Sequence, residues 1–152
     1  MHRSTIALVA GLAALLVLPV PSLAAKPVRE AVVADNFTIF GSCAFDVDVE
    51  VLANKEIGTA FSDGRVHITG HVVLCLTNAA KPGNSIVLNV SGPAFLDLDD
   101  PSIFTGRGTG LSFVEGRLLV THGPAIFVAD ETGNETLTLT SASAVDLNAR
   151  LA

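Results

Sequence analysis

Strict alternation between apolar and polar residues, from Phe37 to Val51, is the feature that most limits what this chain can form. Every odd position in this run is apolar or small, and most even positions carry polar or charged side chains. A period of two matches the alternating faces of a β-strand, whereas a helix repeats every 3.6 residues. We therefore predict a half-buried strand, bent or bulged at Gly41 because an unbroken strand of that length is rare.

Further β-rich runs follow along the chain, separated by turn-forming residues. Turn signals about every 8–12 residues, with β-branched runs between them, are typical of an all-β protein. We predict a single antiparallel β-sandwich or small β-barrel domain, and only Ala142 to Leu151 is compatible with a short C-terminal helix. The later strands are predicted at Val66–Thr77, Ser85–Ser91, Ile103–Thr105, Leu111–Val114, Leu118–Thr121, Ala125–Ala129 and Glu135–Ser141.

The beginning of the chain has the order of a secretory signal peptide. A basic start at Met1–Arg3 precedes an apolar run from Ile6 to Val20, and small residues stand at Ser22 and Ala24. The run of about 15 residues is shorter than the roughly 20 that span a bilayer. We predict a signal peptide over residues 1–24, cleaved after Ala24 or alternatively after Ala25, and one secreted β-rich domain over residues 25–152.

The charge and the aromatic content of the domain limit its partners. The whole chain has a formal net charge of −6, which becomes −7 once Arg3 is lost with the signal peptide. An acidic domain repels phosphate backbones and anionic membrane surfaces. The chain also has no Trp and no Tyr, the side chains on which sugars and bases commonly stack. We therefore expect no nucleic-acid partner and no stable membrane insertion after cleavage.

Two cysteines, Cys43 and Cys75, fall within the predicted mature domain. An exported protein matures where disulfides persist, and two cysteines allow one pairing. We predict a structural Cys43–Cys75 disulfide, worth roughly 3–4 kcal/mol by the chain-entropy model, with two buried free thiols as the alternative. The strand pattern places Cys75 on the opposite face from Leu74 and Leu76, so the geometry of this bridge stays open.

Three groups of side chains contain the residue types used in metal binding or acid–base chemistry. His67 and His71 share one side of a predicted strand, but four strand residues span about 13 Å, too far for one ion. Asp46, Asp48 and Glu50 form a row that is best explained as a solvated strand face. The acidic turn 97–100 lacks the loop of an EF-hand and offers calcium only a weak site. We predict no metal site.

No motif for nucleotide binding or nucleophilic catalysis is present. The glycine-rich run Gly106–Gly110 lacks the Lys-Ser/Thr of a P-loop, and alternate glycines in strands more often allow close packing or a bend. No Gly-x-Ser-x-Gly elbow occurs. We therefore predict no cofactor and no catalytic residues, and the sequence favours a protein that is not an enzyme.

Three segments resemble a group of short exported bacterial β-rich proteins that have no assigned function. They are Phe37–Val47, Leu76–Asn78 and Leu88–Pro93. The resemblance covers about half of the predicted mature chain and carries no functional residues over. The Gly108–Phe113 run is also faintly similar to a motif in barrel proteins of the dirigent and allene oxide cyclase type.

Two functional hypotheses remain. The first is a secreted, non-enzymatic domain that acts in protein interaction or as a surface or matrix component. The second is a small β-barrel that encloses an apolar ligand, as a carrier or as a cyclase or isomerase. A cavity lined by convergent polar groups favours the second hypothesis, and a core filled by its own side chains favours the first.

Overall fold

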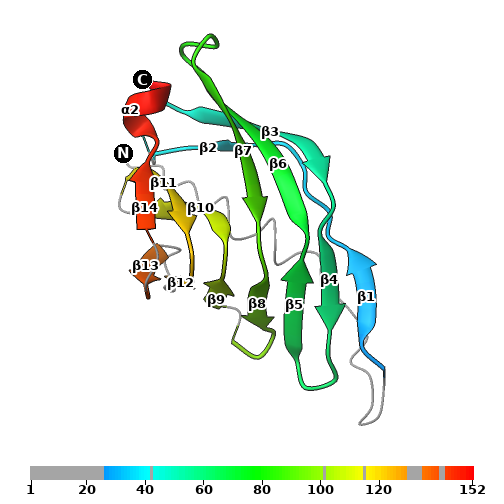
Figure 1. Cartoon of the computed structure of the whole chain (residues 1–152). Helices are drawn as coiled ribbons and strands as arrows, with labels where there is room; N and C mark the ends of the chain where they lie inside the picture. The colour runs from blue at the N-terminus through cyan, green and yellow to red at the C-terminus, as the bar shows by residue number, and fades with distance from the viewer. Residues whose placement is uncertain (1–25, 42, 101, 115, 130–134, 141–142) are drawn as a thin grey trace, which may run out of the picture.

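A computed structural model of the whole chain describes residues 26–41, 43–100, 102–114, 116–129, 135–140 and 143–152 (Figure 1). The predicted signal peptide and its cleavage residues, Ala24 and Ala25, lie outside the described residues. The elements are β1 (Val28–Ala31), β2 (Phe37–Ile39), β3 (Val47–Asn54), β4 (Ile57–Ala60), β5 (Arg65–Thr69), β6 (His71–Asn78), β7 (Ser85–Ser91), β8 (Ala94–Asp97), β9 (Ile103–Gly106), β10 (Thr109–Val114), β11 (Arg117–His122), β12 (Ala125–Ala129), β13 (Glu135–Leu139), β14 (Ser143–Asp146) and α2 (Asn148–Leu151).

The strands form two antiparallel sheets of seven, which confirms the all-β prediction. One sheet has the order β1-β4-β5-β8-β9-β12-β13, and the other has the order β14-β11-β10-β7-β6-β3-β2. Each sheet therefore ends on two edge strands among the described residues, an arrangement closer to a sandwich than to a closed barrel. Within the described part of the chain, no helix has the length and hydropathy needed to cross a bilayer.

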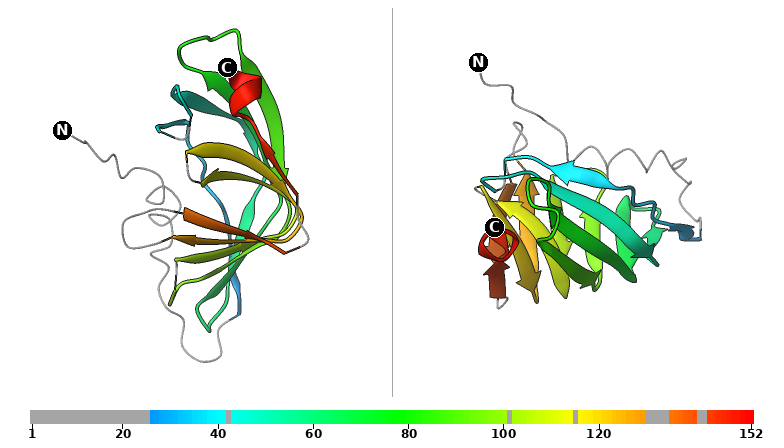
Figure 2. Two further views of the ribbon diagram at one scale, coloured as in Figure 1. Left: turned by 90° about the vertical axis from the view of Figure 1, so that its left-hand side faces the viewer. Right: turned by 90° about the horizontal axis from the view of Figure 1, so that it is seen from above.

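The two sheets are largely the two halves of the same long strands. Pairs that follow one another in the chain, such as β5 with β6 and β7 with β8, occupy corresponding places in the two sheets. The pairing continues across the junction without a shift, because Ser91 pairs with Thr109 on one side and Ala94 with Gly106 on the other. The left view of Figure 2 shows the strands bent sharply at mid-length, so that the halves open like a V.

A row of glycines forms this crease. Gly70, Gly92, Gly108 and Gly123 have φ angles of 115°, 129°, 119° and 103°, which side chains with a Cβ rarely adopt. A Cβ on Gly92 would come within 1.8 Å of the Arg107 carbonyl oxygen, and one on Gly108 within 2.2 Å of the Ser91 oxygen. The neighbouring backbones thus approach so closely at the crease that only glycine fits there.

The structure corrects the predicted extent of three elements. The alternating run Phe37–Val51 is a pair of antiparallel strands, β2 and β3, in which Phe37 pairs with Val49, and the turn between them contains Gly41. The predicted strand Val66–Thr77 divides at Gly70 into β5 and β6. The helix α2 covers only the end of the predicted helical stretch, because β14 occupies its beginning.

The main hydrophobic core belongs to the sheet that contains β6. Alternate residues of β6 are buried, as its amphipathic pattern requires. Leu147 and Leu151 of the C-terminal segment join this core, and Asn78 Nδ2 donates a hydrogen bond of 2.9 Å to the Leu151 carbonyl. The buried members of the core are Ile39, Val47, Val49, Val72, Leu74, Leu76, Ile86, Leu118, Val120, Leu147 and Leu151.

The predicted Cys43–Cys75 disulfide is wrong, because both cysteines are free thiols. Cys75 pairs with Glu50 and Val87, and the side chains of both these residues are exposed. Cys43 instead packs against the buried core and donates to Asn148 Oδ1 at 2.5 Å. The buried core residues of β6 are the neighbours of Cys75 in the chain, so Cys75 itself faces away from the core. The two thiols therefore lie in different surroundings.

Candidate functional site

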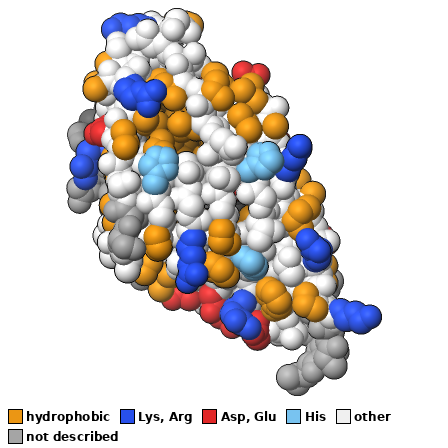
Figure 3. Space-filling model, in the orientation of Figure 1, with side chains coloured by type: hydrophobic (Ala, Val, Ile, Leu, Met, Phe, Trp, Pro, Cys, Tyr) orange, Lys and Arg blue, Asp and Glu red, His pale blue; other side chains and the backbone are white. Residues whose placement is uncertain are grey.

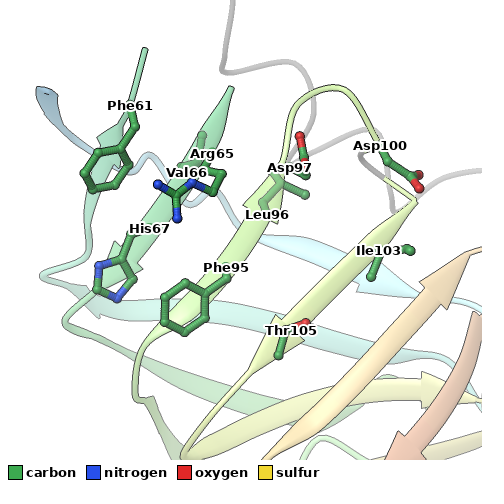
Figure 4. Close-up of a pocket in the computed structure, with 10 residues that line it drawn as sticks. All are labelled: Phe61, Arg65, Val66, His67, Phe95, Leu96, Asp97, Asp100, Ile103 and Thr105. Atoms are coloured by element: carbon green, nitrogen blue, oxygen red, sulfur yellow. The ribbon is translucent and has the colours of Figure 1, made fainter. Parts of the chain in front are cut away.

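A groove of about 390 Å³ lies on the sheet that contains β5 and β8. Its lining comes from β5, β8, β9 and the turns next to them. β5 is distant in sequence from β8 and β9, and strand pairing brings it beside β8. Figure 4 shows His67, Phe95 and Thr105 projecting from neighbouring strands on the same side. The residues that line the groove are Phe61, Arg65, Val66, His67, Phe95, Leu96, Asp97, Asp100, Ile103 and Thr105.

A stack of rings forms the part of the groove nearest the crease. His67 and Phe95 are direct cross-strand partners, so their side chains leave the same face of the sheet. Their rings lie nearly parallel, with centroids 4.6 Å apart and planes inclined by 5°. The Arg107 guanidinium carbon lies over the same Phe95 ring, 5.7 Å from its centroid, at a distance where the cation is attracted by the ring.

Charged groups form the opposite end of the groove. Arg65 Nη2 lies 2.7 Å from Asp63 Oδ2, and its guanidinium carbon lies 5.7 Å from the centroid of the Phe61 ring. The hydrogen bond from Arg65 holds the pKa of the Asp63 carboxyl below its usual value and raises the pKa of Arg65. Asp97 is the cross-strand partner of Arg65, so a second carboxylate lies beside the same cation.

One nitrogen of the His67 ring is buried without a partner. His67 Nε2 has no accessible surface and no hydrogen-bond partner among the described residues. Stacking against Phe95 covers the ring while supplying no hydrogen bond. An unsatisfied buried polar atom is unfavourable, by roughly 1–3 kcal/mol, so the stack holds this ring at some cost in stability.

Apolar side chains on the same face remain open to solvent. Phe95 and Ile103 are 40% and 41% exposed, and Val128 on β12 is 38% exposed. The registers place Ile103 opposite Val128, so the apolar strip continues from the groove on to β12. Apolar contacts flanked by paired charges suit recognition of another surface.

The structure separates the histidines that the sequence placed together. His67 belongs to the groove, whereas His71 lies in the other sheet, on the far side of the crease at Gly70. No group of three or more His, Cys, Asp or Glu side chains within the described residues is arranged to hold a metal ion.

The acidic residues singled out from the sequence occupy exposed positions. Asp46, Asp48 and Glu50 are all exposed, and Asp48 accepts a 2.8 Å hydrogen bond from Thr38. In the acidic turn, Asp97 accepts from the Asp99 backbone and Asp100 accepts from Ser102. Asp48 therefore supports the pairing of β2 with β3, and Asp97 and Asp100 stabilise the acidic turn.

The glycine-rich run Gly106–Gly110 contributes to the crease, as expected for glycines that allow a bend. Gly108 is one of its positive-φ residues, and the segment connects β9 to β10 without a helix. Sequence reasoning did not find the groove itself. The sequence shows that Arg65 and His67 alternate with apolar residues. Their pairing with Asp97 and Phe95, however, depends on the register between the two strands.

The comparisons with known proteins identify no relative. A scan of protein-family models and searches of curated proteins and of solved structures found no significant match.

Proposed function

We propose that this chain is exported and acts as a non-enzymatic extracellular domain that binds another protein through the face carrying the groove. The observation that carries the proposal is the exposure of Phe95 and Ile103 on one face of a folded sheet, with the cations of Arg65 and Arg107 beside them. Large apolar side chains left in water at one place, with charges at their margin, are typical of interaction sites.

The filled core supports surface binding over the enclosure of an apolar ligand. The buried members of the main core have side chains that are at most 9% exposed and pack against one another. The groove, in contrast, is open to solvent, and its apolar residues are partly exposed. A carrier needs a lined space inside the molecule, whereas an interaction domain needs accessible contacts on a rigid support.

Export is supported by the order of charge, apolar run and small residues at the start of the chain. An exposed apolar face also suits a location outside the cell, because the available partners there include surface and matrix proteins. The free state of the two thiols is no argument against export, because Cys43 packs against the core and Cys75 lies on the opposite face of β6 from the core residues.

Site-directed photo-cross-linking tests the proposal. A benzophenone amino acid is placed at Ile103 in the groove, or at Val87 as a control that is 61% exposed on the other sheet. After incubation with medium and cell surfaces of the producing organism, we expect one cross-linked protein of defined mass from position 103 and none from position 87. Equal products from both positions, or none from either, would contradict the proposed site.

A further variant checks that the contact is the groove itself. Phe95→Ser removes the ring that stacks on His67 and underlies Arg107, and it should abolish the product from position 103. The control substitution Leu52→Ser changes a side chain that is 49% exposed on the other sheet, and it should leave the product unchanged.

A further inference from the structure

A second surface follows the crease and differs in character from the groove. The registers of the β6 sheet align five polar residues of successive strands: His71 with Ser91, Ser91 with Thr109, Thr109 with His122, and His122 with Ser143. Directly paired residues project from the same face of a sheet. We name as the crease row these five residues and Lys55: Lys55, His71, Ser91, Thr109, His122 and Ser143.

The crease row begins with a cation and is partly ordered by its own contacts. Lys55 N donates to the His71 carbonyl at 2.9 Å, which fixes Lys55 next to His71 at the end of the row. Thr109 Oγ1 and His122 Nδ1 lie 3.2 Å apart, within hydrogen-bonding distance. At the usual strand spacing of about 4.8 Å, six strands place these groups along a line of roughly 24 Å.

Arg107 adds a second permanent cation beside the row. It lies in the crease between β9 and β10, and its backbone N–H donates to the Pro93 carbonyl at 2.9 Å. Its side chain is exposed and makes no ion pair among the described residues. Lys55 is exposed in the same way, so the charges of both cations remain available to a ligand.

The charge of this face contrasts with that of the whole molecule. The chain has a formal net charge of −6, yet the crease row and Arg107 contain no carboxylate. Figure 3 shows His side chains over the middle of this face, with Lys and Arg side chains spread across it and Asp and Glu side chains at its margins. Charge complementarity therefore selects an anionic partner for this strip.

We propose that the crease row and Arg107 bind an extended anionic polysaccharide, such as a chain of uronic acids. Carboxylates would pair with Lys55 and Arg107, while sugar hydroxyls would exchange hydrogen bonds with the Ser, Thr and His side chains. This proposal goes beyond protein binding at the groove, with which it shares only Arg107.

The composition of the strip favours a polysaccharide over a nucleic acid. Nucleic-acid sites use many phosphate-neutralising Lys and Arg residues or exposed rings on which bases stack. The strip has two such cations, and its other members are hydroxyl and imidazole groups. Hydroxyl and imidazole groups in a row beside two cations match a polymer that itself carries both hydroxyls and carboxylates. Such contacts are hydrogen bonds and ion pairs, so they need no Trp or Tyr ring.

Titration calorimetry with defined oligogalacturonate tests the proposal on the full domain. We expect binding that weakens with added salt, because exposed charges are screened over about 8–10 Å at physiological ionic strength. The variant Lys55→Ala/Arg107→Ala should bind roughly five- to tenfold more weakly, as expected for the loss of two exposed ionic contacts. The control Lys26→Ala/Arg150→Ala removes the same charge from exposed residues outside the strip and should bind as the parent does.

Three results would overturn the proposal. They are no binding of oligogalacturonate by the parent, equal weakening by the two double variants, and tighter binding of a single-stranded DNA oligonucleotide than of the oligouronate. A neutral dextran oligomer should not bind measurably. The groove variant Ile103→Ser should bind oligogalacturonate as the parent does, so that failure of the groove hypothesis and failure of this one are distinguishable.

Discussion

Replacement of Gly92 by alanine tests directly whether the molecule is one set of strands folded at a glycine crease. Gly92 has a φ of 129°, and its Cβ would stand 1.8 Å from the Arg107 carbonyl oxygen, where real Cβ atoms keep at least 3.0 Å. Relief of this clash requires β7–β8 and the Arg107 backbone to separate. The hydrogen bond from Arg107 N to the Pro93 carbonyl spans this junction and would be strained or lost.

The magnitude follows from these two effects. A residue with a Cβ held at such a φ costs about 1–3 kcal/mol. Loss of one backbone hydrogen bond adds about 0.5–1.5 kcal/mol. We therefore expect Gly92→Ala to lower the free energy of unfolding by about 1.5–4.5 kcal/mol, a large part of the 5–15 kcal/mol typical of a domain.

Urea unfolding of the parent and two variants measures this effect. Gly83→Ala is the matched control, because its Cβ would meet nothing within 4 Å and its φ is not in the left-handed region. The control should change the free energy of unfolding by no more than about 0.5 kcal/mol. Equal stability of Gly92→Ala and the parent would refute the close approach at the crease.

Three further predictions concern the thiols, the C-terminal helix and Glu56. Reduction should leave the mass of the folded protein unchanged, and a gain of two hydrogens would show that the disulfide exists. Burial raises the pKa of the Cys43 thiol, so its alkylation at pH 8 should be slower than that of an exposed peptide thiol. Leu151→Ala should lower the free energy of unfolding by about 2–5 kcal/mol, because this side chain is fully buried, and a change near zero would show that α2 is not docked. Burial raises the pKa of Glu56 above its usual 4.5, so its protonated form stabilises the fold and this contribution is lost as the pH rises through the raised value. Urea unfolding of Glu56→Gln should therefore show a stability gain over the parent at pH 7 that disappears near pH 4, and a gain independent of pH would contradict the burial of the charge.

The all-β fold was predictable because its signal is local. Alternation of apolar and polar residues and the spacing of turns define strands without reference to distant parts of the chain. The strand Ser85–Ser91 was predicted with the boundaries that β7 has, since turn residues flank it on both sides. The run Phe37–Val51 was misread as one strand because both strands of a tight pair can carry the same alternation.

The crease and the groove were not predictable, because both depend on register. A single glycine within a strand pattern indicates a bend, as it did at Gly70. That Gly70, Gly92 and Gly108 stand opposite one another follows only from the pairing of successive strands. The same holds for the stack of His67 on Phe95, which joins residues from β5 and β8.

The free thiols show how a general rule was overridden by a local pattern. An exported chain with two cysteines usually forms a disulfide. The alternation of β6, however, placed Cys75 on the face opposite the core residues Leu74 and Leu76, and the structure keeps it there. The face of the strand, which the sequence already indicated, decided the outcome.

Native mass spectrometry of the protein recovered from the producer's culture medium is the most direct test of an exported domain that binds through its surface. We predict a bare chain that begins at Ala25 and carries no small molecule. A protein found only inside the cell, with the first 24 residues attached, would contradict export. A small-molecule adduct that leaves on denaturation would contradict surface binding and favour a carrier of an apolar ligand.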